Sequence, residues 1–101
     1  MRETFKDLQI SKEVLFAEVN DKLDSKNMAY ASREQVFLNF NIGAMLLGTN
    51  RVKYGLSLLA KHIVRLMRDG DTMKLDILLE ITSDMIAYLV LIYSMRRADN
   101  K

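Results

Sequence analysis

The spacing of apolar residues, together with the absence of proline, most constrains the fold of this chain. Apolar residues recur every three or four positions along most of the sequence, which is the spacing of one face of an α-helix. The 101 residues include no proline and only four glycines, and no segment alternates cleanly between apolar and polar residues as a half-buried strand does. These patterns predict an all-α fold.

Glycines and polar clusters divide this helical pattern into four segments. Ser11 is expected to cap the first helix, after a lead-in from Thr4, and Ser32 opens the second in a capping-box sequence, "SREQ". Gly48 and Gly70 are expected to end the second and third helices. Short connections between the helices predict an antiparallel bundle of about four helices. The helices are expected at about residues 11–25, 32–48, 51–68 and 71 or 72–97.

The apolar stripes predict which sides of the last two helices are buried. On the fourth helix, apolar residues such as Val90, Leu91 and Tyr93 extend around the C-terminal half, and a helix that is apolar all round is buried on all sides. We therefore expect a homodimer or a larger homo-oligomer. The stripe expected to face inward on the third helix comprises Val52, Leu56, Leu59, Ile63 and Leu66.

Length and composition narrow the class of protein. The chain is expected to form a single helical domain over residues 1–101, with residues 1–10 as a flexible lead-in. The absence of cysteine excludes disulfides, zinc–thiolate sites and a cysteine nucleophile. The charged N-terminus is unlike a signal peptide, and the run from Met85 to Met95 is too short to span a membrane. A net charge of +2 makes nucleic acid a less favoured partner, and a cytoplasmic protein is expected.

Three carboxylates fall on one stripe of the fourth helix. Asp76, Glu80 and Asp84 follow each other at four-residue steps, and like charges at this spacing destabilise a helix by a few tenths of a kcal/mol per pair. A hard cation such as Mg²⁺, basic side chains from a facing helix, or water alone could offset this repulsion. On the third helix, Lys61 and Arg65 are also four residues apart. They could pair with Glu80 and Asp84 in salt bridges, or share with them a polar pocket that holds phosphates and Mg²⁺.

Three segments resemble a known family. "KNMAYASREQVFLNF", "LLAKHIVRL" and "LEITSDMIAYLVLIYSM" are similar in order and spacing to the small phage-encoded domains called nucleotide-modification-associated, which look distantly like the all-α nucleotide pyrophosphatases of the MazG type. The resemblance covers about residues 25–95. The residues that carry it are Lys26, Tyr30, Lys61, Arg65, Glu80, Asp84 and Tyr88.

The resemblance implies an oligomeric helical protein of phage origin that handles nucleotides in the host-cell cytoplasm. The pyrophosphatases carry two acids on each of two helices, whereas here Glu34 is followed one turn later by Leu38. Binding without catalysis is therefore favoured over Mg²⁺-dependent pyrophosphohydrolysis, and no catalytic residue is assigned.

The leading functional hypothesis is a nucleotide or nucleotide derivative bound between helices. Lys61 and Arg65 would hold phosphate, and Tyr30 or Tyr88 would stack on a base, with Lys26 at the edge of the pocket. Glu80 and Asp84 would bind Mg²⁺ or orient the two cations. An alternative is a phage interaction module that modulates a host enzyme or defence component through an apolar patch on the first or fourth helix. A third possibility is a purely structural oligomer-former.

Overall fold

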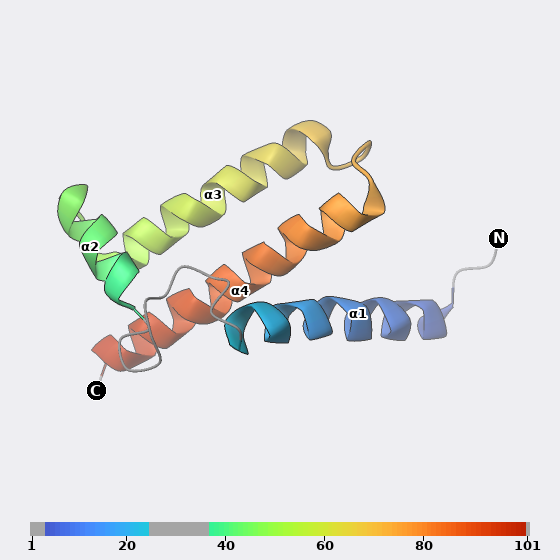
Figure 1. Ribbon diagram of the computed structural model, residues 1–101, viewed down its shortest axis with the longest axis horizontal. Helices are drawn as coiled ribbons and strands as arrows, with labels where there is room; N and C mark the ends of the chain where they lie inside the picture. Colours follow the sequence, from blue (N-terminus) through green and yellow to red (C-terminus); the bar gives the residue numbers. More distant parts are fainter. Residues whose placement is uncertain (1–3, 25–36, 101) are drawn as a thin grey trace.

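The computed structural model describes residues 4–24 and 37–100. These two ranges form four α-helices and no strand, so the predicted all-α fold is confirmed (Figure 1). The helices are α1 (Phe5–Asp24), α2 (Leu38–Leu46), α3 (Arg51–Asp69) and α4 (Leu75–Asp99).

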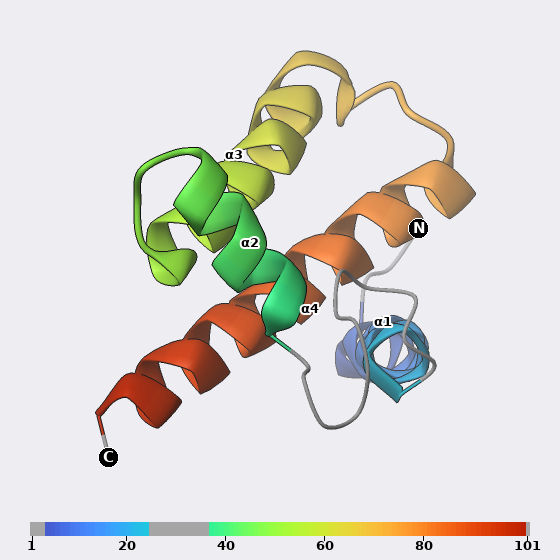
Figure 2. The same cartoon turned by 60° about the vertical axis from the view of Figure 1, so that its left-hand side comes forward.

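The fold is organised around α4. Among the four helices, α1 and α3 each pack against α4, and the short α2 packs against α3 (Figure 2). As predicted, α3 and α4 run antiparallel, because only residues 70–74 join them; α1, in contrast, runs in the same general direction as α4 (Figure 1). Among the helices of the described ranges, α1 packs against α4 alone, so these helices form an open arrangement around α4.

The first helix starts earlier than the sequence suggested. Thr4 and Asp7 form a reciprocal cap: the Thr4 amide donates to the Asp7 carboxylate at 2.9 Å, and the Asp7 amide donates to the Thr4 hydroxyl at 3.3 Å. The prediction of Ser11 as the N-cap is therefore wrong, because Ser11 lies inside α1 and donates its hydroxyl to the Asp7 carbonyl.

The end of α2 follows the sequence closely. Gly48 adopts a φ of 66°, and the amides of Gly48 and Thr49 donate to the carbonyls of Met45 and Ala44, which is the Schellman arrangement. The side chain of Asn50 then accepts from the amide of Lys53 and caps α3. Predicted N-cap Ser32 lies outside the described residues.

The register of α3 on α4 differs from the prediction. Gly55 and Leu59 are buried, and His62 lies against Tyr88 with 5.7 Å between ring centroids, whereas Leu56 and Ile63 are exposed. The physical reason is the close approach at Gly55, where a Cβ atom would lie 3.0 Å from the side chain of Ile92. Periodicity alone favours the larger apolar residues for the inward stripe, but the position without a side chain permits the closer helix packing.

The buried core lies toward the C-terminal half of α4. It consists of Val19, Phe40, Ala87, Leu91 and Met95, which come from α1, α2 and α4. Beside it, Arg51 at the start of α3 donates to the Asp99 carboxylate at 2.5 Å and lies over the Phe37 ring. In the N-terminal half of α4, Ile81 and Ser83 are buried as well.

Candidate functional site

The carboxylates singled out on α4 meet a lysine from α1. The ammonium of Lys22 lies 2.5 Å from Oδ1 of Asp84 and 3.2 Å from Oε1 of Glu80, and it also donates to the Glu80 carbonyl at 3.0 Å. All three N–H bonds of the ammonium therefore have an acceptor. We refer to Lys22, Glu80 and Asp84 as the Lys22 clasp.

Helical spacing explains how the clasp forms. Lys22 follows Val19 by one turn, so its aliphatic stem lies on the buried side of α1 and its charged end reaches past that side to α4. Ser83, which is fully buried, donates to the same Glu80 carbonyl and adds a polar neighbour between the two helices. Lys22 itself is only 6% exposed, which makes it the most buried charged residue of the described chain.

The clasp keeps Lys22 charged in spite of its burial. Burial by itself lowers the pKa of this lysine, but the hydrogen bonds to Asp84 and Glu80 and the two negative charges outweigh it, so the pKa of Lys22 is raised above its usual value. The pKa of the nearby Tyr88 phenol is also raised, first by burial and then by the charge of Asp84. Both groups are thus held in their neutral-pH protonation states.

The predicted pairing of Glu80 and Asp84 with Lys61 and Arg65 is not the one that the structure contains. Lys61 and Arg65 are exposed on α3, and neither forms an ion pair with any residue of the described ranges. The reason is the register of α3: Leu59 and His62 face α4, which leaves both cations on the outer side. The charge partner comes from α1, which the sequence analysis did not consider.

The other predicted binding residues divide into two groups. Lys26, Tyr30 and Glu34 lie outside the described residues. Tyr88 is half-buried, with its ring edge-on to Phe40 at 6.4 Å between centroids and next to His62. These contacts place Tyr88 among the residues that pack α2 and α3 onto α4.

Glu80 and Asp84, the two predicted Mg²⁺ ligands, both face a lysine. No group of three or more His, Cys, Asp or Glu side chains converges within residues 4–24 and 37–100. The Lys22 ammonium contacts both carboxylates. Of the three expected offsets for the acid stripe, a basic side chain is therefore present, and Mg²⁺ binding stays a prediction.

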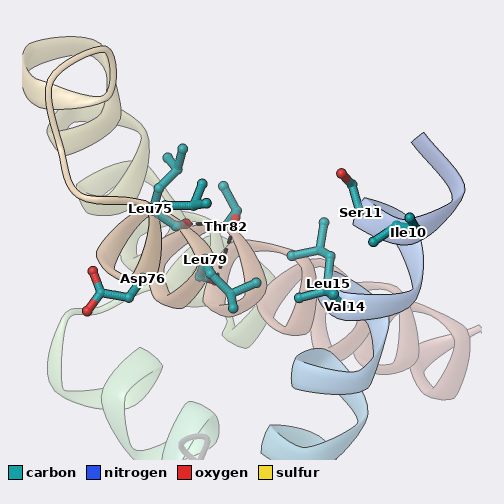
Figure 3. A pocket seen from close by; sticks show the side chains of 9 residues that line it. Ile10, Ser11, Val14, Leu15, Leu75, Asp76, Leu79 and Thr82 are labelled. Atoms are coloured by element: carbon teal, nitrogen blue, oxygen red, sulfur yellow. Dashed lines mark hydrogen bonds between the residues drawn. The ribbon is translucent and has the colours of Figure 1, made fainter. Parts of the chain in front are cut away.

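An apolar groove opens between the N-terminal halves of α1 and α4 (Figure 3). Its volume is about 710 Å³. Among its described lining residues, Asp76 alone is charged, and it lies at one edge with its carboxylate turned away from the apolar side chains (Figure 3). The lining residues are Ile10, Ser11, Val14, Leu15, Leu75, Asp76, Leu78, Leu79 and Thr82.

The two hydroxyls that line the groove are already engaged. Ser11 donates to the Asp7 carbonyl at 3.0 Å, and Thr82 donates to the Leu78 carbonyl at 2.7 Å. Neither hydroxyl therefore needs a partner from a ligand, and the groove presents methyl and methylene groups. Such a surface binds apolar side chains and offers no donor to a phosphate.

The groove continues into a stripe along α4, which we call the open face, whose two ends are exposed and whose middle residues, Leu79, Thr82 and Ile86, are half-buried. Leu75 is 81% exposed, Leu89 is 50% exposed and Tyr93 is 68% exposed. The open face carries no charged residue between its two ends and consists of Leu75, Leu79, Thr82, Ile86, Leu89, Val90 and Tyr93. The wide apolar surface of the fourth helix was visible in the sequence, whereas the groove depends on the angle between α1 and α4.

Comparisons with known proteins leave the site to be interpreted from its own geometry. No protein-family model, curated protein or solved structure matches the chain. Within the described parts of the chain, no helix has both the length and the hydropathy of a membrane span.

Proposed function

We propose that this chain is a non-enzymatic interaction protein that binds an apolar helical segment of another protein in the groove between α1 and α4. The observation that supports the proposal is the groove itself, about 710 Å³ of apolar surface whose hydroxyls are engaged within their own helices. A groove between two helices accepts the apolar side of an amphipathic helix, whose side chains at positions i, i+3, i+4 and i+7 fill it.

The ion pairs of the Lys22 clasp also support the proposal. Lys22 pairs with both Glu80 and Asp84, so its single positive charge offsets part of the negative charge of the acid stripe. The clasp fixes the C-terminal end of α1 on α4. If the resemblance to phage proteins reflects ancestry, a host enzyme or defence component is the implied class of partner.

Native mass spectrometry of the tagged protein, purified from the cells that make it, tests the proposal. Val14→Glu places a carboxylate in the groove at a half-exposed position, so binding of the partner is expected to fall by on the order of 100-fold. Lys53→Glu, at an exposed position of α3 away from the groove, is the matched control and should retain the partner. Identical sets of bound proteins for the wild type and Val14→Glu would refute the proposal.

A nucleotide-binding function is the second candidate, because Lys61 and Arg65 are exposed and have no ion-pair partner among the described residues. Two cations one helical turn apart can hold a phosphate group, the arginine through two parallel hydrogen bonds. In this candidate, a nucleotide binds on the outer side of α3 and any Mg²⁺ arrives with its phosphates.

Isothermal titration calorimetry with a panel of nucleotides, with and without Mg²⁺, tests the second candidate. Binding that is lost in Lys61→Ala and Arg65→Ala would support it, and the variant Glu80→Ala separates a role of the acid stripe from that of the two cations. Absence of heat across the panel would eliminate it.

A further inference from the structure

We infer that a second copy of this chain covers the open face of α4, with the two α4 helices packed antiparallel. This inference rests on the proposed function, since it names what occupies the same surface when no other protein does. Three observations carry it: the exposed apolar side chains of the open face, the pattern of apolar residues about the middle of α4, and the charges at the two ends of that helix.

The open face exposes large apolar side chains that a second copy could cover. Near its C-terminal end, Leu89 is 50% exposed and Val90 is 41% exposed. Leu75 and Tyr93, at the two ends of the open face, are among the most exposed large apolar residues.

The open face is complementary to itself when one copy is reversed. If the two-fold axis passes midway between Thr82 and Ile86, these two residues lie opposite each other across the axis. The same symmetry brings Leu79 opposite Leu89, and Leu75 opposite Tyr93. Leu75, Leu79, Leu89 and Tyr93 therefore each meet an apolar side chain, and Ile86 meets Thr82, whose hydroxyl is engaged within its own helix. The interface spans about 27 Å of helix and places Tyr93 of one copy beside the groove of the other.

Charges at the ends of α4 favour the antiparallel arrangement. The last turn carries Arg96 and Arg97, while Asp71 precedes the helix and Asp76 lies in its first turn. Reversing one copy brings the arginines of each chain beside the acids of the other, with Arg97 opposite Asp71. A parallel pair would instead bring four arginines together and align two helix dipoles, which is unfavourable.

Measurement of mass in solution tests the dimer. At 10 µM the wild type should have the mass of two chains, by native mass spectrometry and by sedimentation. Leu89→Arg places one charge from each chain within the interface, opposite Leu79, and should raise the dissociation constant by on the order of 100-fold or more. The matched control is Leu46→Arg, which adds the same charge at an exposed apolar position of α2 and should remain dimeric. Because Leu89 is half-exposed in one chain, circular dichroism should show unchanged helicity in both variants.

Disulfide cross-linking tests the direction of the helices, and the chain has no cysteine of its own to interfere. A tagged Leu79→Cys chain mixed with an untagged Leu89→Cys chain should form the mixed disulfide under mild oxidation. Each variant alone should cross-link poorly, and so should Lys61→Cys, which is exposed on α3. Efficient cross-linking of Leu79→Cys with itself would indicate a parallel pair and refute the arrangement.

The outcomes separate this inference from the proposed function. The inference is overturned if the wild-type chain stays monomeric at 100 µM, or if Leu89→Arg leaves the dimer intact. In either case the proposed function stands if Val14→Glu still abolishes binding of another protein. If the antiparallel dimer is found but Val14→Glu changes no bound protein, the inference stands and the proposed function falls.

Discussion

Lys22 joins α1 to α4 through Glu80 and Asp84. Replacing it with methionine keeps the aliphatic stem but leaves Asp84, whose side chain is 23% exposed, without its cation. We expect Lys22→Met to lower the free energy of unfolding by about 2–3 kcal/mol, because an acceptor between packed helices loses its charged partner. Urea denaturation measures this change.

Lys12→Met is the control for this substitution, because Lys12 is exposed on the same helix. We expect it to change the free energy of unfolding by less than about 0.5 kcal/mol. Equal effects of the two substitutions would show that the clasp contributes nothing to stability.

The raised pKa of Lys22 also predicts a pH dependence. Folded Lys22 holds its proton more tightly than the unfolded chain does, so the clasp stabilises the protein fully below the ordinary lysine pKa of about 10.4. This stabilisation is lost as the pH rises from there through the higher pKa of the folded protein. The difference in unfolding free energy between wild type and Lys22→Met should therefore be constant from about pH 7 to 10 and narrow above it. A difference that narrows between pH 7 and 9 would contradict this assignment.

At the scale of single elements, the turn after α2 offers the clearest prediction. Gly48 has a positive φ, in which a Cβ atom is strained, although no neighbouring atom would meet it. Gly48→Ala should therefore destabilise the protein by about 1–2 kcal/mol through backbone strain alone, and Gly48→Asn by less, because asparagine tolerates this conformation. Thermal unfolding of the two variants compares them, and equal losses would argue against a backbone cause.

Helix ends that depend on neighbouring residues could largely be predicted from the sequence. Gly48 as the end of α2 and Arg51 as the start of α3 depend on residues within a few positions, and both predictions are confirmed. The start of α1 was missed because the Thr4–Asp7 cap was overlooked in favour of a serine nearer the apolar stripe. Helix α4 starts three or four residues after the predicted position. The amides of Thr72 and Met73 donate to the Asp69 carbonyl, so these residues form a turn before α4 begins.

Helix–helix geometry was harder to predict. The short connection correctly paired α3 with α4, but the rotation of α3 depends on the close contact at Gly55, and periodicity carries no information about such a contact. The partner of Glu80 and Asp84 depends on where α1 lies, and residues distant in sequence decide this. Mg²⁺, basic side chains of a facing helix and water alone were the alternatives expected to offset the acid stripe; the structure contains a basic side chain, and Lys22 as its source was missed.

At the scale of the whole molecule, the pattern of contacts predicts an order of local unfolding. Among the four described helices, α3 packs against both α2 and α4, whereas α1 packs against α4 alone. The amides of α1 should exchange with solvent deuterium at least about tenfold faster than those in the centre of α3, since local opening there breaks fewer buried contacts. Lys22→Met should speed exchange in α1 and leave α3 unchanged. Uniform protection of both helices would indicate a single cooperative unit.

Because the Lys22 clasp attaches α1 to α4 near its C-terminal end, the N-terminal end of α1 can rotate about that point. Ile10 lies twelve residues from Lys22, or about 18 Å along the helix. A rotation of about 10° around the Lys22 clasp would move the Ile10 end by about 3 Å, roughly the width of a methyl group. A small rotation of α1 can thus adapt the groove between α1 and α4 to side chains of different size, while the hydrogen bonds of the Lys22 clasp stay intact.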